Sequence, residues 1–322
     1  MGMKVDVSEI KTFKACGRQW QLSSRNRFHM RPIVTPPQLA LGTIFHESLA
    51  QLYLGVSLDK VMAMVRREMK TDSDAALLAM IPGYYNKVLP GDLDRFTVLD
   101  IEWHFEVPPT TSDGEYLFPI EHKVDAKTGE LCYNDNGDPI MEPSLVVCGS
   151  IDMVVLDKAE GKIYGFEHKT CKNFRDESFL WMDEQPRVYT WALQQYIHNY
   201  NEKHGTDYAL GGVYLNEVKK LLRQFQYNRT LCTYTDEDLD HFMQAFFSDC
   251  NSCKHAVDNN SYAAPKPSYF SCGNCAYKTI CSTYMYAPLS EVDVLEEFKE
   301  EFVKREEDHL NEKAERSTAD GQ

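Results

Sequence analysis

The chain has 322 residues, of which 43% are hydrophobic and 12% aromatic, so it is long enough to bury a sizeable core in one large domain. Its formal net charge of -15 argues against nucleic-acid binding by the whole surface and leaves only a local basic groove open. No apolar run approaches the roughly 18 residues that a membrane span needs, and the first residues lack the apolar segment of a secretory signal. We therefore expect a cytoplasmic protein that does not contact a membrane.

The cysteine content indicates metal or redox chemistry. The sequence contains 10 Cys, and we expect them in a compartment that keeps thiols reduced. A metal site or a reactive cysteine is then a better expectation than a framework of disulfides.

The first third of the chain is predicted to be helical. Residues 7–22 fit one helix with Ser8 as its N-cap, and Cys16 lies near the end of that helix. Pro36 and Pro37 mark the start of a further helical region that continues to about residue 88.

The middle of the chain changes from a helical to a strand periodicity. Three apolar or alternating segments are separated by turn signals such as KTGE, DNGD and AEGK, which predicts consecutive strands of one sheet. A helix and two more strands follow, and a second helix leads into a cysteine-rich segment. The predicted strands are 97–108, 144–157, 162–170, 208–218 and 221–230, and the predicted helices are 183–200 and about 235–257.

Two segments lie outside this pattern. Residues 108–143 are more than a hairpin connection needs, and we expect them to form an extra hairpin beside the sheet. Residues 291–322 start as an acidic amphipathic helix with Leu295, Phe298 and Phe302 on its apolar side, and then become polar enough to fray as a flexible tail.

Two charged residues stand in the predicted strand YGFEHKT. Because side chains alternate across a strand, Glu167 and Lys169 project from one face, about 7 Å apart, while Phe166 and His168 face the other way. A carboxylate and an ammonium group therefore share one location. One interpretation is an ion pair on a solvated edge, because so short a motif also occurs by chance.

Asp152 suggests a second interpretation, a catalytic metal site. It is a lone acid in the otherwise apolar run from Val146 to Leu156, and an unpaired buried charge costs several kcal/mol unless a cation compensates it. If the two strands pair through the turn DKAEGK, a divalent metal ion fits between Asp152 and Glu167. Hard oxygen ligands suit magnesium or manganese, and Lys169 would then contact the attacking water.

Four motifs stand in a fixed order along the chain. They are LGTIFHESL with His46, GSID with Asp152, EHK with Glu167 and Lys169, and QPRVY with Gln185 and Tyr189. Their order and spacing resemble the RecB-like branch of the PD-(D/E)XK nuclease superfamily. The resemblance implies an α/β (α+β) fold with a restriction-endonuclease-like core, in which helices flank a central mixed sheet and the N-terminal part is helical. Taken alone, His46 also fits a buried core histidine and Tyr189 an aromatic stripe.

The resemblance also implies a chemistry for these residues. His46, Asp152, Glu167 and the backbone carbonyl of His168 would hold one or two Mg²⁺ or Mn²⁺ ions. Such ions polarise a phosphate and lower the pKa of a bound water. Lys169 would position that water or stabilise the phosphorus centre.

Further residues are candidates for binding DNA. Gln185 and Tyr189 stand at positions i and i+4 of a predicted helix, so they share a face and reach one phosphate or base together. Lys172 and Arg175 add local positive potential that could guide a strand despite the acidic surface. Two acids of the preceding strand, interpreted either as an additional ligand or as solvent-facing residues, are Glu102 and Glu106.

Four cysteines form a split set, with one near the N-terminus in FKACGRQW and three in CGNCAYKTIC: Cys16, Cys272, Cys275 and Cys281. This set resembles the iron-sulfur nucleases of the same branch, which include the AddB nuclease domain and the CRISPR-associated Cas-four type exonucleases. The resemblance implies a 4Fe-4S cluster that joins the N- and C-terminal segments as a staple. The nuclease domain would span residues 1–290 and include the cluster region at 268–284.

A structural zinc site is the alternative interpretation of the cysteines. Cys250 and Cys253 precede Cys272 and Cys275 by 18 residues, a spacing typical of zinc ribbons. Against it, the segment around Cys250 and Cys253 is predicted to be helical, and zinc leaves Cys16 and Cys281 without a role. The remaining cysteines, interpreted as structural, are Cys132, Cys148, Cys171 and Cys232.

The resemblance implies a metal-dependent exonuclease that hydrolyses phosphodiester bonds from the ends of single-stranded DNA. A free-standing nuclease suits phage or mobile-element recombination and repair, or CRISPR adaptation, in a bacterial or phage-infected cytoplasm. A recombination or helicase protein is the expected partner. Two alternatives stay open: a catalytically inactive DNA-end or protein-binding module on the same fold, and a zinc-bearing nucleic-acid-binding protein in which EHK is a surface ion pair.

Overall fold

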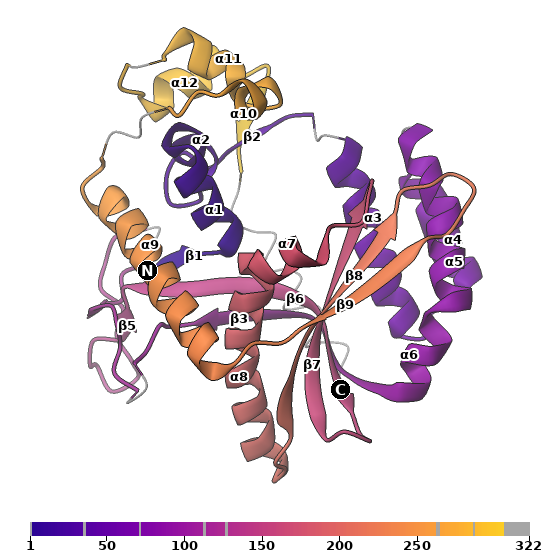
Figure 1. Ribbon diagram of the computed structural model, residues 1–322. Helices are drawn as coiled ribbons and strands as arrows, with labels where there is room; N and C mark the ends of the chain where they lie inside the picture. The colour runs from indigo at the N-terminus through magenta and orange to yellow at the C-terminus, as the bar shows by residue number, and fades with distance from the viewer. Residues whose placement is uncertain are drawn as a thin grey trace. The chain divides into compact units, whose positions relative to one another are not determined.

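The computed structural model describes residues 2–34, 37–70, 72–111, 114–125, 128–261, 265–285 and 287–305. Pro36 and the predicted tail from residue 306 onward lie outside the described residues. The chain folds into two compact units, each built from segments that are distant in the sequence (Figure 1). The first unit consists of Met1–Val34, Glu106–Cys148 and Gln244–Gln322, and the second of Thr35–Phe105 and Gly149–Met243.

The second unit is built on a mixed sheet. Strand β6 (Leu145–Asp157) pairs antiparallel with β7 (Lys162–Cys171), and the ladder runs from Asp157 opposite Lys162 to Met153 opposite Phe166. Strand β7 pairs parallel with β8, and β8 pairs antiparallel with β9. Strand β3 also pairs with β6, so the three predicted middle strands do belong to one sheet. The bounds of the other strands are Phe96–Val107 for β3, Ala209–Lys219 for β8 and Tyr227–Cys232 for β9.

Helices cover both faces of strands β7 to β9, with α3 to α6 on one side and α8 on the other (Figure 1). Helix α8 (Glu184–His204) follows the short α7 (Glu177–Met182) and makes the crossover between the parallel strands β7 and β8. Asp183 caps its first turn by accepting a hydrogen bond from the amide of Gln185. The N-terminal helical region, as predicted, contains α3 (Pro37–Tyr53), α4 (Leu58–Glu68), the 3-10 helix η1 (Asp72–Ala76), α5 (Leu77–Lys87) and α6 (Leu89–Arg95).

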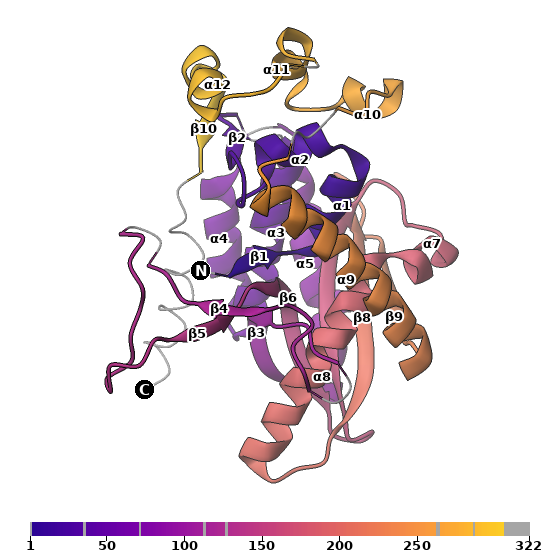
Figure 2. The ribbon, with the colours of Figure 1, turned by 90° about the vertical axis from the view of Figure 1, so that its left-hand side faces the viewer.

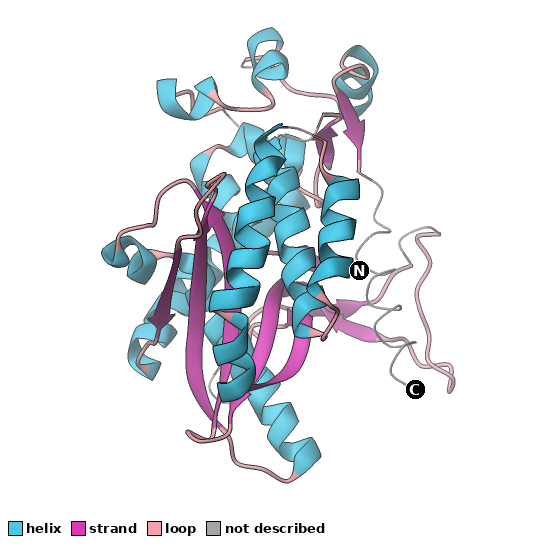
Figure 3. Cartoon of the chain, turned by 90° about the vertical axis from the view of Figure 1, so that its right-hand side faces the viewer, coloured by secondary structure: helices cyan, strands magenta, loops and turns pink. Residues whose placement is uncertain are grey.

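The main core of the second unit lies between these helices and the sheet. Phe45 on α3, Tyr84 on α5 and Phe166 on β7 have no exposed surface, and Figure 3 shows the helices that cover this face. The ring of Phe96 packs at 5.3 Å from that of Phe166 and at 6.0 Å from that of Tyr214. Close packing on this side holds β7 firmly in place.

In the first unit, β1 (Met3–Val5) pairs parallel with the first residues of β6. The single helix predicted for residues 7–22 is in fact two helices, α1 (Val7–Ala15) and α2 (Gly17–Ser23). Cys16 separates them because its backbone is extended, with φ of -159° and ψ of 107°. The N-cap is also different from the prediction, since Asp6 rather than Ser8 accepts the hydrogen bond from the amide of Glu9.

The described residues within 108–143 include the expected extra hairpin. Strand β4 (Ile120–His122) pairs antiparallel with β5 (Met141–Pro143), as Figure 2 shows. Isolated bridges join Val124 to Leu131 and Tyr133 to Pro139, so the segment continues as short hairpins beyond the two strands. Helix α9 (Asp236–Asp258) also agrees with its predicted position.

The C-terminal part of the described chain packs on the N-terminal segment within the first unit. Strand β10 (Phe302–Lys304) pairs antiparallel with β2 (Met30–Pro32), and Phe298 and Phe302 are buried in a small apolar core. The predicted amphipathic helix is shorter than expected, because α12 (Glu291–Glu297) ends before these two residues. A strand pair and an apolar core therefore already join residues 28–32 to residues 294–304. The other short helices are α10 (Tyr269–Gly273) and α11 (Lys278–Thr283).

The central mixed sheet with helices on its faces confirms the fold class expected from the sequence. Across the described ranges, no helix is both long and apolar enough to cross a membrane. The architecture leaves strands β6 and β7, which carry Asp152, Glu167 and Lys169, at the centre of the sheet.

Gly212 on β8 is a position where the fold requires glycine. Its φ is +115°, and a Cβ atom there would lie 2.5 Å from the carbonyl oxygen of Cys232. We expect Gly212→Ala to destabilise the protein by about 2–4 kcal/mol in a urea unfolding experiment. Gly91→Ala in α6 is the control, because no atom lies within 4 Å of the added Cβ. Equal unfolding midpoints for the two variants would contradict the assignment.

Candidate active site on strands β6 and β7

Asp152 lies on β6 just beyond the end of the β6–β7 ladder, and its carboxylate has two partners. Oδ2 accepts a hydrogen bond from the backbone amide of His168 at 2.7 Å, and Oδ1 lies 3.1 Å from Nδ1 of His46 on α3. Burial opposes ionisation of this carboxyl group, but the interactions with His46 and His168 outweigh it and lower the pKa of Asp152 to about 2. Asp152 is therefore held as an anion.

Glu167 and Lys169 form an ion pair on β7. Glu167 is only 3% exposed, and its burial, together with the negative charge of Asp152, raises the pKa of Glu167 to about 7. Burial opposes the charge of Lys169, but the carboxylate of Glu167 outweighs it, so the pKa of Lys169 is raised. The pair shares a face, as the alternation predicts, but it is not on a solvated edge because Glu167 is buried.

Gln185 on α8 faces this pair. Its Nε2 donates hydrogen bonds to Oε1 of Glu167 at 3.1 Å and to the hydroxyl of Tyr189 at 2.7 Å. Tyr189 is 7% exposed, and its ring packs 6.0 Å from that of Phe105. The two residues share a helix face as predicted, and Gln185 connects the hydroxyl of Tyr189 to the carboxylate of Glu167.

A small cavity of about 10 Å³ adjoins Asp152, which is about the space that one water molecule or ion needs. Its lining includes His46, His168 and Glu102. Glu102 has a φ of +51°, a conformation that costs on the order of 1–3 kcal/mol outside glycine. Glu106, the other predicted candidate, pairs with Lys4 at 2.5 Å instead. Of the two acids, Glu102 is the one that lies beside Asp152.

The donor set around this cavity fits a hard divalent cation. The carboxylates of Asp152 and Glu102 line the cavity, and carboxylate oxygens are the ligands that magnesium and manganese prefer. Among the residues that the structure describes, no three His, Cys, Asp or Glu side chains already stand in an arrangement that holds a metal ion. Asp152 and Glu167 are engaged by His46, His168, Lys169 and Gln185, which shows that both carboxylates need positive or hydrogen-bonding partners.

Arg175 has a structural position that the sequence did not reveal. Its guanidinium donates to Asp183 at 2.9 Å and to the fully buried Glu217 at 2.9 Å. Because Asp183 caps the helix that carries Gln185, Arg175 ties that helix to the sheet. Lys172, also predicted to guide a DNA strand, is exposed.

Polar residues behind β7 were also missed by the sequence analysis. Asn216 on β8 lies opposite His168, and Arg229 on β9 links it to Asp92 on α6. The sequence signal for Asn216 was a polar residue inside an otherwise apolar strand, as in VYLNEV. The same signal identified Asp152.

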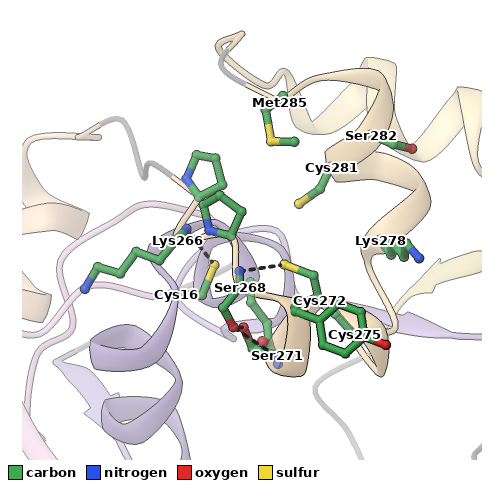
Figure 4. A pocket seen from close by; sticks show the side chains of 14 residues that line it. Cys16, Lys266, Ser268, Ser271, Cys272, Cys275, Lys278, Cys281, Ser282 and Met285 are labelled. Atoms are coloured by element: carbon green, nitrogen blue, oxygen red, sulfur yellow. Dashed lines mark hydrogen bonds between the residues drawn. The ribbon is translucent and has the colours of Figure 1, made fainter.

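Four predicted cluster ligands lie together in the first unit. Cys16, Cys272, Cys275 and Cys281 line one cavity of about 340 Å³, and in Figure 4 the sulfur atoms of Cys16, Cys272 and Cys281 point toward the same space. Backbone amides donate to two of the sulfur atoms, from Lys266 to Cys16 at 3.5 Å and from Ser268 to Cys272 at 3.4 Å. Burial raises the pKa of Cys275 and, to about 11, that of Cys281, so the four cysteines share one cavity without an arrangement that already holds them as thiolates.

Cys250 and Cys253, the additional cysteines of the zinc alternative, are elsewhere. Both are fully buried in α9, and neither lines the cavity of Figure 4. Burial raises the pKa of both thiols well above their usual range, which opposes the thiolate form that zinc needs. Their environment is that of small apolar residues on a buried helix face.

A sequence model of the PD-(D/E)XK nuclease superfamily matches residues 5–282 of the chain. This range contains the histidine, aspartate, glutamate–lysine and glutamine–tyrosine motifs and also the four cysteines of the cavity. The chain belongs to the PD-(D/E)XK nuclease superfamily. This membership supports a nuclease, an enzyme class that acts on DNA and typically uses Mg²⁺ or Mn²⁺.

The solved structures that match this chain have low sequence identity to it. The crystal structure of SSO0001 matches with a TM-score of 0.31 and 10% identity over 89% of this chain and 88% of that chain. A proposed exonuclease from Eubacterium rectale matches with a TM-score of 0.45 and 11% identity over 90% of this chain and 91% of that chain. At these values neither likeness carries an argument about fold or function. None of the curated proteins matches this chain.

The raised pKa of Glu167 predicts how the stability of the metal-free protein depends on pH. A carboxyl group with a pKa of about 7 in the folded state and 4.5 otherwise binds more protons folded than unfolded between these values. Stability therefore falls as the pH rises from about 5 to 7.5, by on the order of 1–3 kcal/mol from this residue. Thermal unfolding in EDTA at a series of pH values measures this loss of stability. We expect the loss to be absent in Glu167→Gln.

The matched control for this experiment is Glu202→Gln, the same change at a side chain on α8 that is 70% exposed. It should keep the wild-type pH dependence. A Glu167→Gln variant that loses stability with pH as steeply as the wild type would show that Glu167 does not titrate in this range.

Proposed function

We propose that this chain is a Mg²⁺- or Mn²⁺-dependent deoxyribonuclease that hydrolyses phosphodiester bonds. The observation that carries the proposal is the convergence of Asp152, Glu167 and Lys169 at the end of the β6–β7 ladder. The pKa of Asp152 is lowered and that of Glu167 is raised, and both carboxyl groups lie near the ammonium group of Lys169. Membership of the superfamily supports the same reaction class.

His46, Asp152, Glu167 and the carbonyl oxygen of His168 would hold the divalent ion, which would polarise the scissile phosphate and lower the pKa of a bound water. Lys169 keeps its proton because its pKa is raised, so its ammonium group stabilises negative charge on the phosphate rather than accepting a proton. The hydrogen bond from Gln185 to Glu167 fixes the orientation of that carboxylate.

We further propose that the substrate is DNA with free ends, in its single-stranded form, and that the enzyme is an exonuclease. The support is the resemblance of the four motifs to the RecB-like branch. The net charge of -15 also favours a local site over binding along a surface. The same resemblance suggests a role in phage or mobile-element recombination and repair, or in CRISPR adaptation, with a helicase or recombination protein as partner.

Cleavage of end-labelled single-stranded DNA by anaerobically purified protein with Mn²⁺ or Mg²⁺ tests the activity. We expect Asp152→Ala and Lys169→Ala to lower the rate by at least about 10³-fold, because each removes a group that stabilises the transition state. EDTA should abolish cleavage.

Lys162→Ala is the matched control, since Lys162 lies at the other end of β7 and its side chain is 45% exposed. It should keep the wild-type rate. If wild type and both site variants are equally inert on single-stranded and duplex DNA, the chain is a binding module that retains the fold without the reaction.

We also propose that Cys16, Cys272, Cys275 and Cys281 bind a 4Fe-4S cluster. The support is their common cavity and the amide donors directed at two of the sulfur atoms. Zinc bound through Cys250 and Cys253 is disfavoured by the burial of both thiols. Because β2 and β10 pair and Phe298 and Phe302 are buried, the proposed cluster adds to a connection that packing already makes.

Metal analysis of the anaerobically purified protein tests the cluster. We expect stoichiometric iron and sulfide with visible charge-transfer absorption, and we expect Cys16→Ser and Cys281→Ser to lose both. Cys132→Ser, on the extra hairpin, should keep them. Zinc in place of iron would contradict the proposal.

A further inference from the structure

A buried polar network lies on the face of β7 opposite to Glu167 and Lys169. His168 points to this face, is 3% exposed, and stacks on the ring of Tyr53 with centroids 6.2 Å apart and planes 26° apart. Its backbone amide donates to Asp152 at 2.7 Å. One residue therefore touches Asp152 through its backbone and the buried network through its side chain.

Asn216 on β8 fixes the orientation of the His168 ring. Its Oδ1 lies 2.7 Å from Nε of Arg229 and 3.0 Å from the hydroxyl of Tyr227. Because an arginine nitrogen only donates, Oδ1 must be the acceptor, and the amide group cannot be flipped. Nδ2 of Asn216 then donates to Nδ1 of His168 at 3.3 Å, and the ring proton of His168 lies on Nε2.

Arg229 is itself anchored at several points. Its two terminal nitrogens donate to the two carboxylate oxygens of Asp92 at 2.6 and 2.7 Å, and Tyr53 donates to the same carboxylate at 2.5 Å. Asp92 is 5% exposed and Asn216 fully buried, so water does not compete for these bonds. A rigid chain of hydrogen bonds runs from α6 through Arg229 and Asn216 to His168.

This network stabilises the protein interior less than apolar packing would. A buried ion pair contributes little net stability compared with apolar side chains of the same volume, because both charges lose their hydration. What the network does provide is a defined geometry for every group that it touches. The group at its end is His168, the residue between Glu167 and Lys169.

We propose that Asn216 is a positioning residue for the nuclease reaction, acting through His168. By holding the imidazole it fixes the short part of β7 that presents Glu167 and Lys169 on one face and donates an amide to Asp152. This inference rests on the proposed nuclease function. It assigns a role in the reaction to a residue on the far side of the strand.

Asn216→Ala tests the proposal. We expect kcat to fall by about 10–100-fold with little change in KM for DNA, and the affinity for Mn²⁺, measured by calorimetry without DNA, to fall by a similar factor. Kinetics are measured well below the melting temperature of each variant, so that a loss of stability alone does not change kcat. Tyr227→Phe is the matched control, because Arg229 still orients the amide, and it should keep wild-type values.

A second variant, Asn216→Asp, keeps an acceptor for Arg229 but presents an oxygen to His168. The ring must then donate, and its proton moves from Nε2 to Nδ1. Ring-¹⁵N spectra of histidine-labelled protein report this change of tautomer independently of any activity.

The outcomes separate the two proposals. An active wild type with Asn216→Ala within about twofold of its kcat and Mn²⁺ affinity overturns the positioning role. An unchanged histidine tautomer in Asn216→Asp overturns the hydrogen-bond assignment on which it depends. A wild type that binds Mn²⁺ but cleaves no DNA overturns the nuclease function, while weaker Mn²⁺ binding by Asn216→Ala would still support the positioning of the carboxylates.

Discussion

The hydrogen bond from the His168 amide to Asp152 is the interaction on which the candidate site depends. The ladder between β6 and β7 ends at Met153 and Phe166, and beyond this point the carboxylate of Asp152 replaces a strand carbonyl as the partner of the β7 backbone. A side chain in place of a main-chain acceptor lets two neighbouring strands separate without leaving a buried amide unpaired. The small cavity that Asp152 lines lies at this point of the sheet.

The electrostatics of this space favour a divalent cation. Asp152 and Glu167 lie close enough that the charge of one raises the pKa of the other, and burial strengthens the effect. Asp152 is held ionised, while the pKa of Glu167 is raised to about 7. A cation bound beside both groups would lower the pKa of Glu167 again. Lys169 and His46 supply part of that positive charge in the protein itself. The protein's own cations therefore balance the charge of the two buried carboxylates only in part.

The sequence predicted those features that depend on periodicity and on single misplaced residues. The middle strands alternate clearly, and Asp152 stands out because it interrupts an apolar run. The break at Cys16 was not predicted, because it depends on a local backbone change that side-chain periodicity does not record. Phe302 stands at helical spacing from Phe298, but its pairing with β2 outweighs this preference. The partners of His168 could not be predicted from the sequence, because they come from three elements that are distant along the chain.

The position of Cys16 has a consequence for synthesis of the protein. The amide that donates to its sulfur belongs to Lys266, 250 residues further along the chain. A ribosome synthesises every residue of the second unit, which ends at Met243, before it adds Cys272. The cysteine cavity therefore forms only after Cys281 has been made, so a cofactor bound there would distinguish chains synthesised to this point from shorter ones that already contain Asp152 and Glu167.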